Sequence, residues 1–142
     1  MEIANRVYQN SSIGKLRLTG TLLENMDLIN RNSVAILHVD DQILEKAGCA
    51  ADDLEGLINM PLAAQSVQAV VMFKLVGDRL RISLRSKGNL DVRAIAVRYG
   101  GGGHRNAAGC SIAALGSESR EAIIAELVNS IRIETAHSES NL

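Results

Sequence analysis

The chain has 142 residues, of which 46% are hydrophobic and 22% are charged, and its formal net charge is −1. This length suits one domain with a real core, and this composition excludes a disordered chain. No run reaches the roughly 18 apolar residues of a membrane helix, and the N-terminus lacks a signal-peptide pattern, so we expect a cytoplasmic protein without a membrane partner. The cysteines, Cys49 and Cys110, have no metal-type spacing and are expected to be reduced.

Hydrophobic periodicity predicts that helices dominate the first 60 residues, with one strand among them. The expected elements, in chain order, are a helical lead-in over 2–9, a helix over 14–29, a strand over 34–39, a helix from Asp40-Asp41 through Ala47, and a short helix after Asp52-Asp53. Met60-Pro61 is expected to end this region, because the residue before a proline is pushed out of helical geometry.

A β-hairpin is predicted next, with residues 67–76 and 79–86 on either side of Gly77-Asp78, a pair suited to a two-residue turn. One register places apolar side chains together on one face: Leu75 with Leu80, Phe73 with Ile82 and Val71 with Leu84. The opposite face then carries Lys74, Arg79, Arg81, Ser83 and Arg85. A shift by one residue would mix the two sets, so the alternation predicts the register.

The last third is predicted to hold two helices and a strand. Asp91 can cap a helix that buries Val92, Ile95, Ala96 and Tyr99 and ends at Gly100. We expect one helical turn over 104–108, a strand over 110–114, and a final helix from Ser117. The elements together predict an α/β (α+β) fold, a small mixed sheet with a β-hairpin covered by helices. It forms a single domain over 1–134 with a frayed tail over 135–142.

Four consecutive glycines, Gly100 to Gly103, precede His104. Glycine loses the most entropy on folding, so such a run indicates positive φ or a close approach to the backbone N–H groups. With a basic side chain at its end, the loop suits phosphate, whereas a flexible turn is the alternative. The segment from Lys74 to Arg105 contains eight basic and two acidic residues, so its net charge is +6, and the net charge of the remainder is −7. This coincidence favours a local anion site over a solvated charged face.

These motifs carry a family resemblance. The matching residues are Ser83-Leu84-Arg85-Ser86-Lys87, Asp91-Val92, Ile95-Ala96, Gly100 to His104 and Ala107-Ala108-Gly109. Together they closely resemble the C-terminal DHH-associated domain (type 1) of DHH-family phosphoesterases, in the nano-RNA exonuclease and pAp-phosphatase branch. The match is densest over residues 67–114. The resemblance implies that substrate phosphate is bound by Arg85, Ser86, Lys87, Gly101, Gly102, Gly103 and His104.

The catalytic half of that family is absent from the sequence. There, a DHH domain supplies aspartates and an Asp-His-His motif that hold two divalent ions, expected to be manganese. No Asp-His-His occurs here, and His38, in an apolar run before Asp40-Asp41, is interpreted as a core or strand-end histidine. We therefore expect no catalytic residue, metal site or cofactor in this chain, which should be inactive alone. The expected partner is the DHH domain of the same parent protein.

The resemblance implies that the parent protein is a metal-dependent phosphoesterase, a hydrolase that acts on short oligoribonucleotides or pAp. It also implies that this chain is the substrate-binding domain of that protein. Two alternatives stay open: the equivalent domain of a cyclic-dinucleotide phosphodiesterase, and a non-catalytic RNA-binding module like the related domain of alanyl-tRNA synthetases. The oligomeric state, including a homodimer, also stays open.

Overall fold

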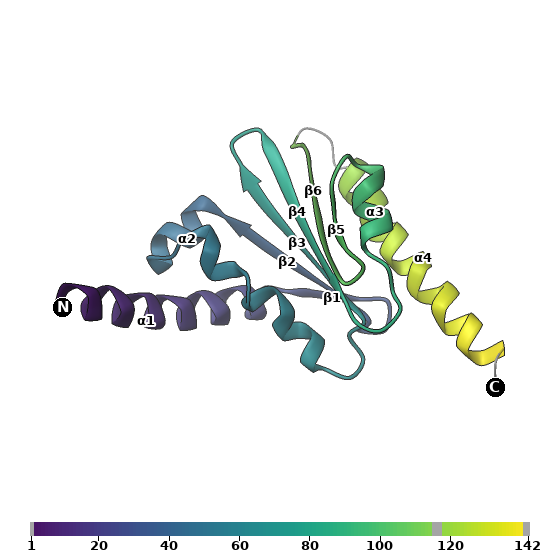
Figure 1. Cartoon of the computed structure of the whole chain (residues 1–142), viewed down its shortest axis with the longest axis horizontal. Coiled ribbons are helices and arrows are strands. Elements are labelled where there is room, and N and C mark those ends of the chain that lie inside the picture. Colours follow the sequence, from purple (N-terminus) through teal and green to yellow (C-terminus); the bar gives the residue numbers. More distant parts are fainter. Residues whose placement is uncertain (1, 115–117, 141–142) are drawn as a thin grey trace.

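A six-stranded sheet forms the centre of the computed structural model (Figure 1). The structure describes the backbone of residues 2–114 and 118–140 and the side chains of residues 13–114 and 118–131. The strand order of the sheet is β1-β2-β3-β4-β6-β5. The strands are β1 (Asp27–Ile29), β2 (Val34–Asp40), β3 (Ala69–Val76), β4 (Arg79–Ser86), β5 (Gly102–His104) and β6 (Ala107–Ala113). β2 and β3 run parallel and all other neighbours antiparallel, so the sheet is mixed, as predicted.

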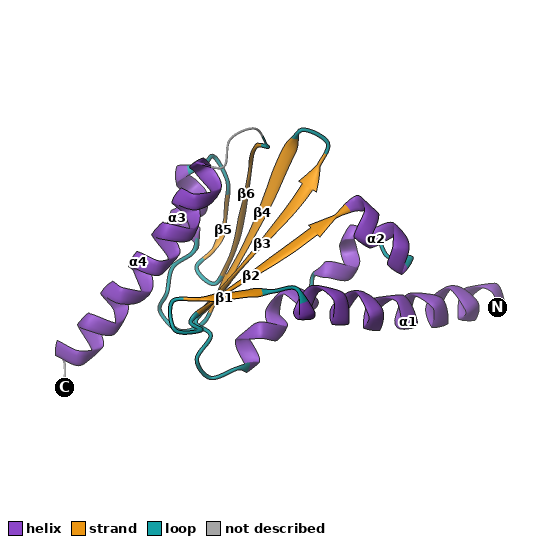
Figure 2. Cartoon of the chain, turned by 180° about the vertical axis from the view of Figure 1, so that it is seen from behind, coloured by secondary structure: helices purple, strands orange, loops and turns teal. Residues whose placement is uncertain are grey.

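Helices flank the sheet on both sides (Figures 1 and 2). They are α1 (Glu2–Glu24), α2 (Asp41–Ala47), the 3-10 helices η1 (Ala51–Leu54) and η2 (Leu57–Ala63), α3 (Arg93–Arg98) and α4 (Glu118–Ser140). Among the described residues, no helix combines the length and apolar character needed to cross a membrane.

The two faces of the sheet have separate hydrophobic cores. On the leucine face, defined by Ile82 and Leu84, the strands pack against α3 and α4, with Ile95, Ile123 and Leu127 fully or almost fully buried. On the arginine face, defined by Arg81 and Arg85, the core joins β2 and β3 to α1, α2, η1 and η2. β4, β5 and β6, which are described in full, contribute no residue to this second core. The half of the arginine face built by these three strands is therefore not covered by this core.

The structure confirms the predicted hairpin of β3 and β4. Phe73 lies opposite Ile82, both almost completely buried, and Leu75 opposite Leu80 and Val71 opposite Leu84 complete the predicted pairs. Gly77 adopts a φ of 59°, the left-handed conformation that a two-residue hairpin turn needs. The alternation of apolar and cationic side chains thus fixes which side chains reach the arginine face.

The helices α2 and α3 each begin with an aspartate that accepts a backbone hydrogen bond, and for α3 this residue, Asp91, and the end at Gly100 were predicted. Asp40 accepts a hydrogen bond from the backbone N–H of Ile43 at 2.8 Å and so caps α2. Asp91 accepts from the N–H of Ala94 at 3.2 Å at the start of α3. Gly100, with a φ of 82°, ends α3 by donating its N–H to Val97 O at 3.1 Å.

The N-terminal prediction was wrong in two respects. The lead-in and the first helix are one continuous helix, α1, and the helix ends at Glu24 instead of residue 29. Gly14 does not break it, because this glycine is buried where α1 approaches the backbone oxygen of Ala47 in α2, and an added Cβ would overlap that oxygen. Residues Asp27–Ile29 form β1, because the following turn returns the chain along β2.

The helical turn expected over residues 104–108 was also wrong. His104 ends β5 and Ala107 begins β6, and the two strands form an antiparallel hairpin. Small residues with no apolar periodicity looked like a local turn, but β6 pairs along its whole length with β4. A partner strand distant in the sequence decided this conformation.

Two predicted boundaries differ as well. Pro61 lies inside η2, which continues to Ala63, because the fixed φ of proline fits a 3-10 turn. The helix α4 runs through Ser140, past the expected start of the frayed tail at residue 135, and the sequence there has no glycine or proline to stop it. Ser117, the predicted first residue of that helix, and residues 141–142 lie outside the described residues.

Candidate phosphate-binding site

Arg85 and His104 lie in one row across the sheet. Arg85 of β4 is opposite Ala107 of β6, and Ala107 is opposite His104 of β5. Directly opposed residues of antiparallel strands point to the same face, so Arg85 and His104 both lie on the arginine face. Two strand spacings, about 10 Å, separate their backbones. The structure therefore places two of the four side chains expected to bind phosphate, Arg85 and His104, in one row on the same face.

Small residues line the floor between these two side chains. On the arginine face, β6 presents Ala107, Gly109 and Ser111, and β5 presents Gly102 beside Gly109. An added Cβ at Gly102 would meet no atom within 4 Å, so the space above it is open. A ligand can therefore lie flat on the strands between Arg85 and His104.

The glycines of the run have different roles. Gly103 has a φ of 134°, and an added Cβ would lie 2.6 Å from both Ala107 O and Ala108 Cα. Gly101 already donates its N–H to Ala96 O at 2.9 Å, at the end of α3. Gly101 and Gly103 thus let the chain pass close to β6. β5 is the last strand in the sheet order, so no described strand pairs with its outer edge.

Ser86 does not join this group. It is opposite Ala69, on the leucine face, and its side chain is buried. Its hydroxyl donates to Leu90 O at 2.6 Å and accepts from Asn106 Nδ2 at 2.9 Å. Ser86 thus holds together the loop after β4, on the side of the sheet opposite Arg85.

Asn106 is a positioning residue that the sequence did not identify. Besides contacting Ser86 Oγ, its side-chain amide donates to Gly88 O at 3.2 Å, and its backbone carbonyl accepts the N–H of Ser86 at 3.1 Å. These bonds tie the turn between β5 and β6 to the end of β4. They set the position of His104 relative to Arg85. An asparagine in a two-residue turn was the available signal, since its side chain commonly bonds nearby backbone.

Ser86→Ala is expected to lower the free energy of unfolding by about 1–3 kcal/mol, because Leu90 O and the amide of Asn106 lose a buried partner. Chemical denaturation of the variant measures this. The control is Ser83→Ala on the arginine face, which should change stability by less than about 0.5 kcal/mol. Equal losses from both variants would contradict the assignment of Ser86 to the fold.

Lys87 is likewise engaged within the chain. Its ammonium contacts the carbonyl oxygens of Leu62 and Ala64 at 3.0 Å each, and that of Gln65 at 3.5 Å. The three donors of a lysine are thus directed at the chain at the end of η2. Lys87 links η2 to the end of β4 instead of extending over the open part of the sheet.

Arg85 is held between the sheet and η1. Its guanidinium donates to Leu84 O at 3.0 Å, and a second nitrogen lies 3.9 Å from Glu55 Oε1. The Arg85 side chain is 18% exposed and that of Glu55 84% exposed. At 3.9 Å, and with Glu55 exposed to solvent, this ion pair is worth little, and another anion can replace Glu55. Glu55 was missed in the sequence because only the packing of η1 over β4 brings it here.

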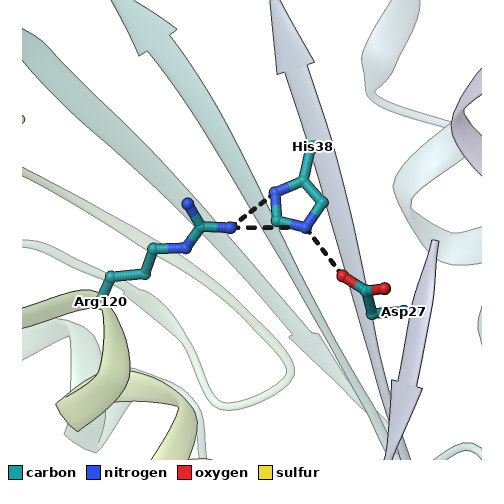
Figure 3. Close-up of polar contacts among 3 residues, drawn as sticks. All are labelled: Asp27, His38 and Arg120. Carbon is teal, nitrogen blue, oxygen red and sulfur yellow. Dashed lines mark hydrogen bonds and ion pairs between the residues drawn. The ribbon is translucent and has the colours of Figure 1, made fainter. Parts of the chain in front are cut away.

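A second polar cluster, on the leucine face, contains His38 (Figure 3). Arg120 of α4 lies 2.7 Å from His38 Nδ1, and Asp27 of β1 lies 3.2 Å from Nε2. A guanidinium can only donate, so Nδ1 is assigned as acceptor and Nε2 as donor to Asp27. Arg120 also stacks over Phe73, 4.5 Å from the ring centre. His38 thus connects α4 with β1 and β2, which supports its interpretation as a structural histidine.

The described residues do not fit the divalent ions that the resemblance implies for the DHH half. Among them, no group of three or more His, Cys, Asp or Glu side chains converges as metal ligands. Arg85 and His104 can instead make charge-assisted hydrogen bonds to an anion.

Comparison with known proteins shows the family of the chain. The DHHA1 domain family matches residues 31–132. The bifunctional oligoribonuclease and PAP phosphatase NrnA of Bacillus subtilis (strain 168) is 31% identical over 111 residues, which are 78% of this chain and 34% of that protein. The chain thus spans about a third of the length of this curated relative.

Two solved structures share the fold. An exopolyphosphatase-related protein from Bacteroides fragilis has a TM-score of 0.71 and 26% identity, covering 82% of this chain and 34% of that one. The pGpG-specific phosphodiesterase PggH from Vibrio cholerae has a TM-score of 0.62 over 86% of this chain and 41% of that one, and at 12% identity it shows the fold alone. With the family match over most of its length, the chain belongs to the DHHA1 domain family of DHH phosphoesterases.

Proposed function

We propose that this DHHA1 domain binds the phosphate groups of short oligoribonucleotides or pAp, for hydrolysis by a DHH domain of the same parent protein. The observation that carries the proposal is the row of Arg85 and His104 on an open, small-residue part of the sheet. The name of the Bacillus subtilis relative, an oligoribonuclease and PAP phosphatase, supports this substrate class. The two divalent ions would be held by the DHH domain.

The two side chains suit complementary roles. Arg85 offers a planar fork that can hold two phosphate oxygens at once, which a lysine cannot reproduce. His104 is exposed and can donate from a ring nitrogen to a phosphate oxygen. Gly102 leaves room between them for the sugar and base. A ligand that binds both must displace the carboxylate of Glu55 from Arg85.

The cysteines fit the proposed cytoplasmic location. Cys49 and Cys110 are both free. Burial raises the pKa of the Cys110 thiol on the leucine face, which disfavours the reactive thiolate.

Titration of the chain with pAp and with a 5′-phosphorylated dinucleotide, followed by NMR, tests the proposal. Shifts are expected to cluster at 85–87 and 100–107, and the affinity should fall as salt rises. Charge-assisted hydrogen bonds contribute about 1.5–3 kcal/mol each, so His104→Ala should weaken binding by roughly tenfold or more. Arg85→Lys should weaken it too, because the charge remains and the fork is lost.

Lys46→Ala is the control, since Lys46 is an exposed residue of α2, outside the basic segment. This variant should bind like the parent chain. If His104→Ala binds as well as the parent chain, or if the shifts are spread evenly over the surface, the glycine run is only a turn and the proposed phosphate-binding role is wrong.

A further inference from the structure

A cavity of about 590 Å³ lies beside Arg85 on the arginine face, between the sheet and η1. Lys74, Arg81, Ser83 and Arg85 line it from β3 and β4, and on the other side it is lined by Asp52 of η1 and by Glu55, the residue after η1. The cavity therefore extends the row of Arg85 and His104 in a new direction, along β4 instead of across the strands.

Two cations in this cavity have no partner among the side chains and backbone that the structure describes. Within the described residues, neither Lys74 nor Arg81 makes a hydrogen bond or an ion pair, whereas Arg79 of the same hairpin donates to Ser111 Oγ at 3.2 Å and to Ser111 O at 2.8 Å. Lys74 is only partly exposed. A partly buried ammonium without a partner loses hydration and gains nothing in return, unless an anion from outside the chain joins it.

The pairing of the strands sharpens this argument. Lys74 and Arg81 lie directly opposite each other in the β3–β4 ladder, on the same face. Like charges at directly opposed positions destabilise a sheet. A ligand anion between them converts this repulsion into two attractions, and a phosphate can accept hydrogen bonds from both side chains.

The distance between Arg85 and the Lys74–Arg81 pair decides what kind of ligand can contact both. Arg81 is four residues before Arg85 on β4, about 13 Å along the strand. Ser83 lies between them on the same face, small and half-buried, so the path along the strand is open. A ligand with one phosphate at Arg85 and another at the Lys74–Arg81 pair must extend over more than one nucleotide.

We infer that Lys74 and Arg81 form a second phosphate subsite, which takes a further internucleotide phosphate of an oligonucleotide whose other phosphate lies at Arg85 and His104. The inference rests on the proposed function. Asp52 and Glu55 on the opposite wall repel a phosphate that strays from β4, so they confine the chain of phosphates to the side of Lys74 and Arg81. The subsite makes affinity depend on ligand length.

Equilibrium binding of pAp and of a 5′-phosphorylated triribonucleotide to the chain and its variants tests the inference. Arg81→Ala and Lys74→Ala should each weaken binding of the triribonucleotide roughly tenfold and change binding of pAp less than about twofold. The slope of log affinity against log salt for the triribonucleotide should fall by about 1 in each variant. Arg93→Ala, an equal loss of charge on α3 at the other face, is the matched control and should leave both ligands unaffected.

Three outcomes are distinguishable. Loss confined to the triribonucleotide in the Lys74 and Arg81 variants supports the subsite. Normal binding of both ligands by Arg81→Ala and Lys74→Ala, or equal weakening by Arg93→Ala, overturns the subsite and leaves the proposed function standing. Failure of the parent chain to bind either ligand overturns the proposed function and the subsite with it.

Discussion

Replacing Gly101 with alanine should lower the free energy of unfolding by about 3 kcal/mol, at the upper end of the range for overpacked sites. The added Cβ would overlap the backbone oxygen of Gly109 and lie 2.7 Å from Cys110 Cβ and 2.8 Å from Cys110 Cα. These atoms belong to β6, which is fixed between β4 and β5 and cannot move aside. Urea denaturation of parent and variant measures the loss as a difference in midpoint, provided that the unfolding free energy of both depends on urea concentration with the same slope.

Gly102→Ala is the matched control, one residue away in the same run. Its added methyl would meet no atom within 4 Å, so stability should stay within about 1 kcal/mol of the parent. The methyl would stand on the arginine face, where we place the ligand, so binding of pAp should weaken while stability holds. Similar denaturation midpoints for Gly101→Ala and Gly102→Ala would show that the close approach to β6 does not govern this loop.

The parts of the fold that follow from neighbouring residues were predicted from the sequence. The hairpin register is one example, because alternating side chains and the Gly77 turn decide it together. The start of α3 is another, since it depends on Asp91 and the N–H group three residues later. For this reason the alternation alone predicts the correct face for Arg81 and Arg85.

The parts that depend on distant partners were not predicted. The strand predicted over 110–114 covers only the second half of β6, and the first half is a strand because β4 lies beside it. Likewise β1 is a strand because β2 lies beside it. The same holds for the site. Arg85, Ser86 and Lys87 are adjacent in sequence and were expected to act together, but strand alternation turns Ser86 to the leucine face, and the carbonyls of η2 engage Lys87.

The wall of the cavity was missed for a related reason. Glu55 follows η1, some 30 residues before Arg85 in the sequence, and only the crossover from β2 to β3 carries it over the sheet. The sequence showed a basic segment and an acidic remainder as separate regions. In the structure, two of those acidic residues face the basic strand across the cavity.

Incubated with manganese and either short RNA or pAp, the 142-residue chain should show no hydrolysis above a protein-free blank. Two-metal hydrolysis needs carboxylates and histidines that converge on both ions, and Asp-His-His does not occur in the sequence. Of the two histidines whose side chains the structure describes, only His38 contacts a carboxylate, Asp27.

His38 is a poor ligand in this setting, because Arg120 donates to its Nδ1 at 2.7 Å and places a positive charge where a metal ion would have to bind. Release of mononucleotides from the RNA and of phosphate from pAp, followed over hours, measures the activity. The His104→Ala variant serves as a comparison, since it should bind less ligand and release equally little product. Manganese-dependent turnover that survives re-purification would contradict the prediction, and its loss in His38→Asn would place the metal at the Asp27–His38–Arg120 cluster. Binding without turnover is the result that fits a domain which holds phosphate for a separate catalytic partner.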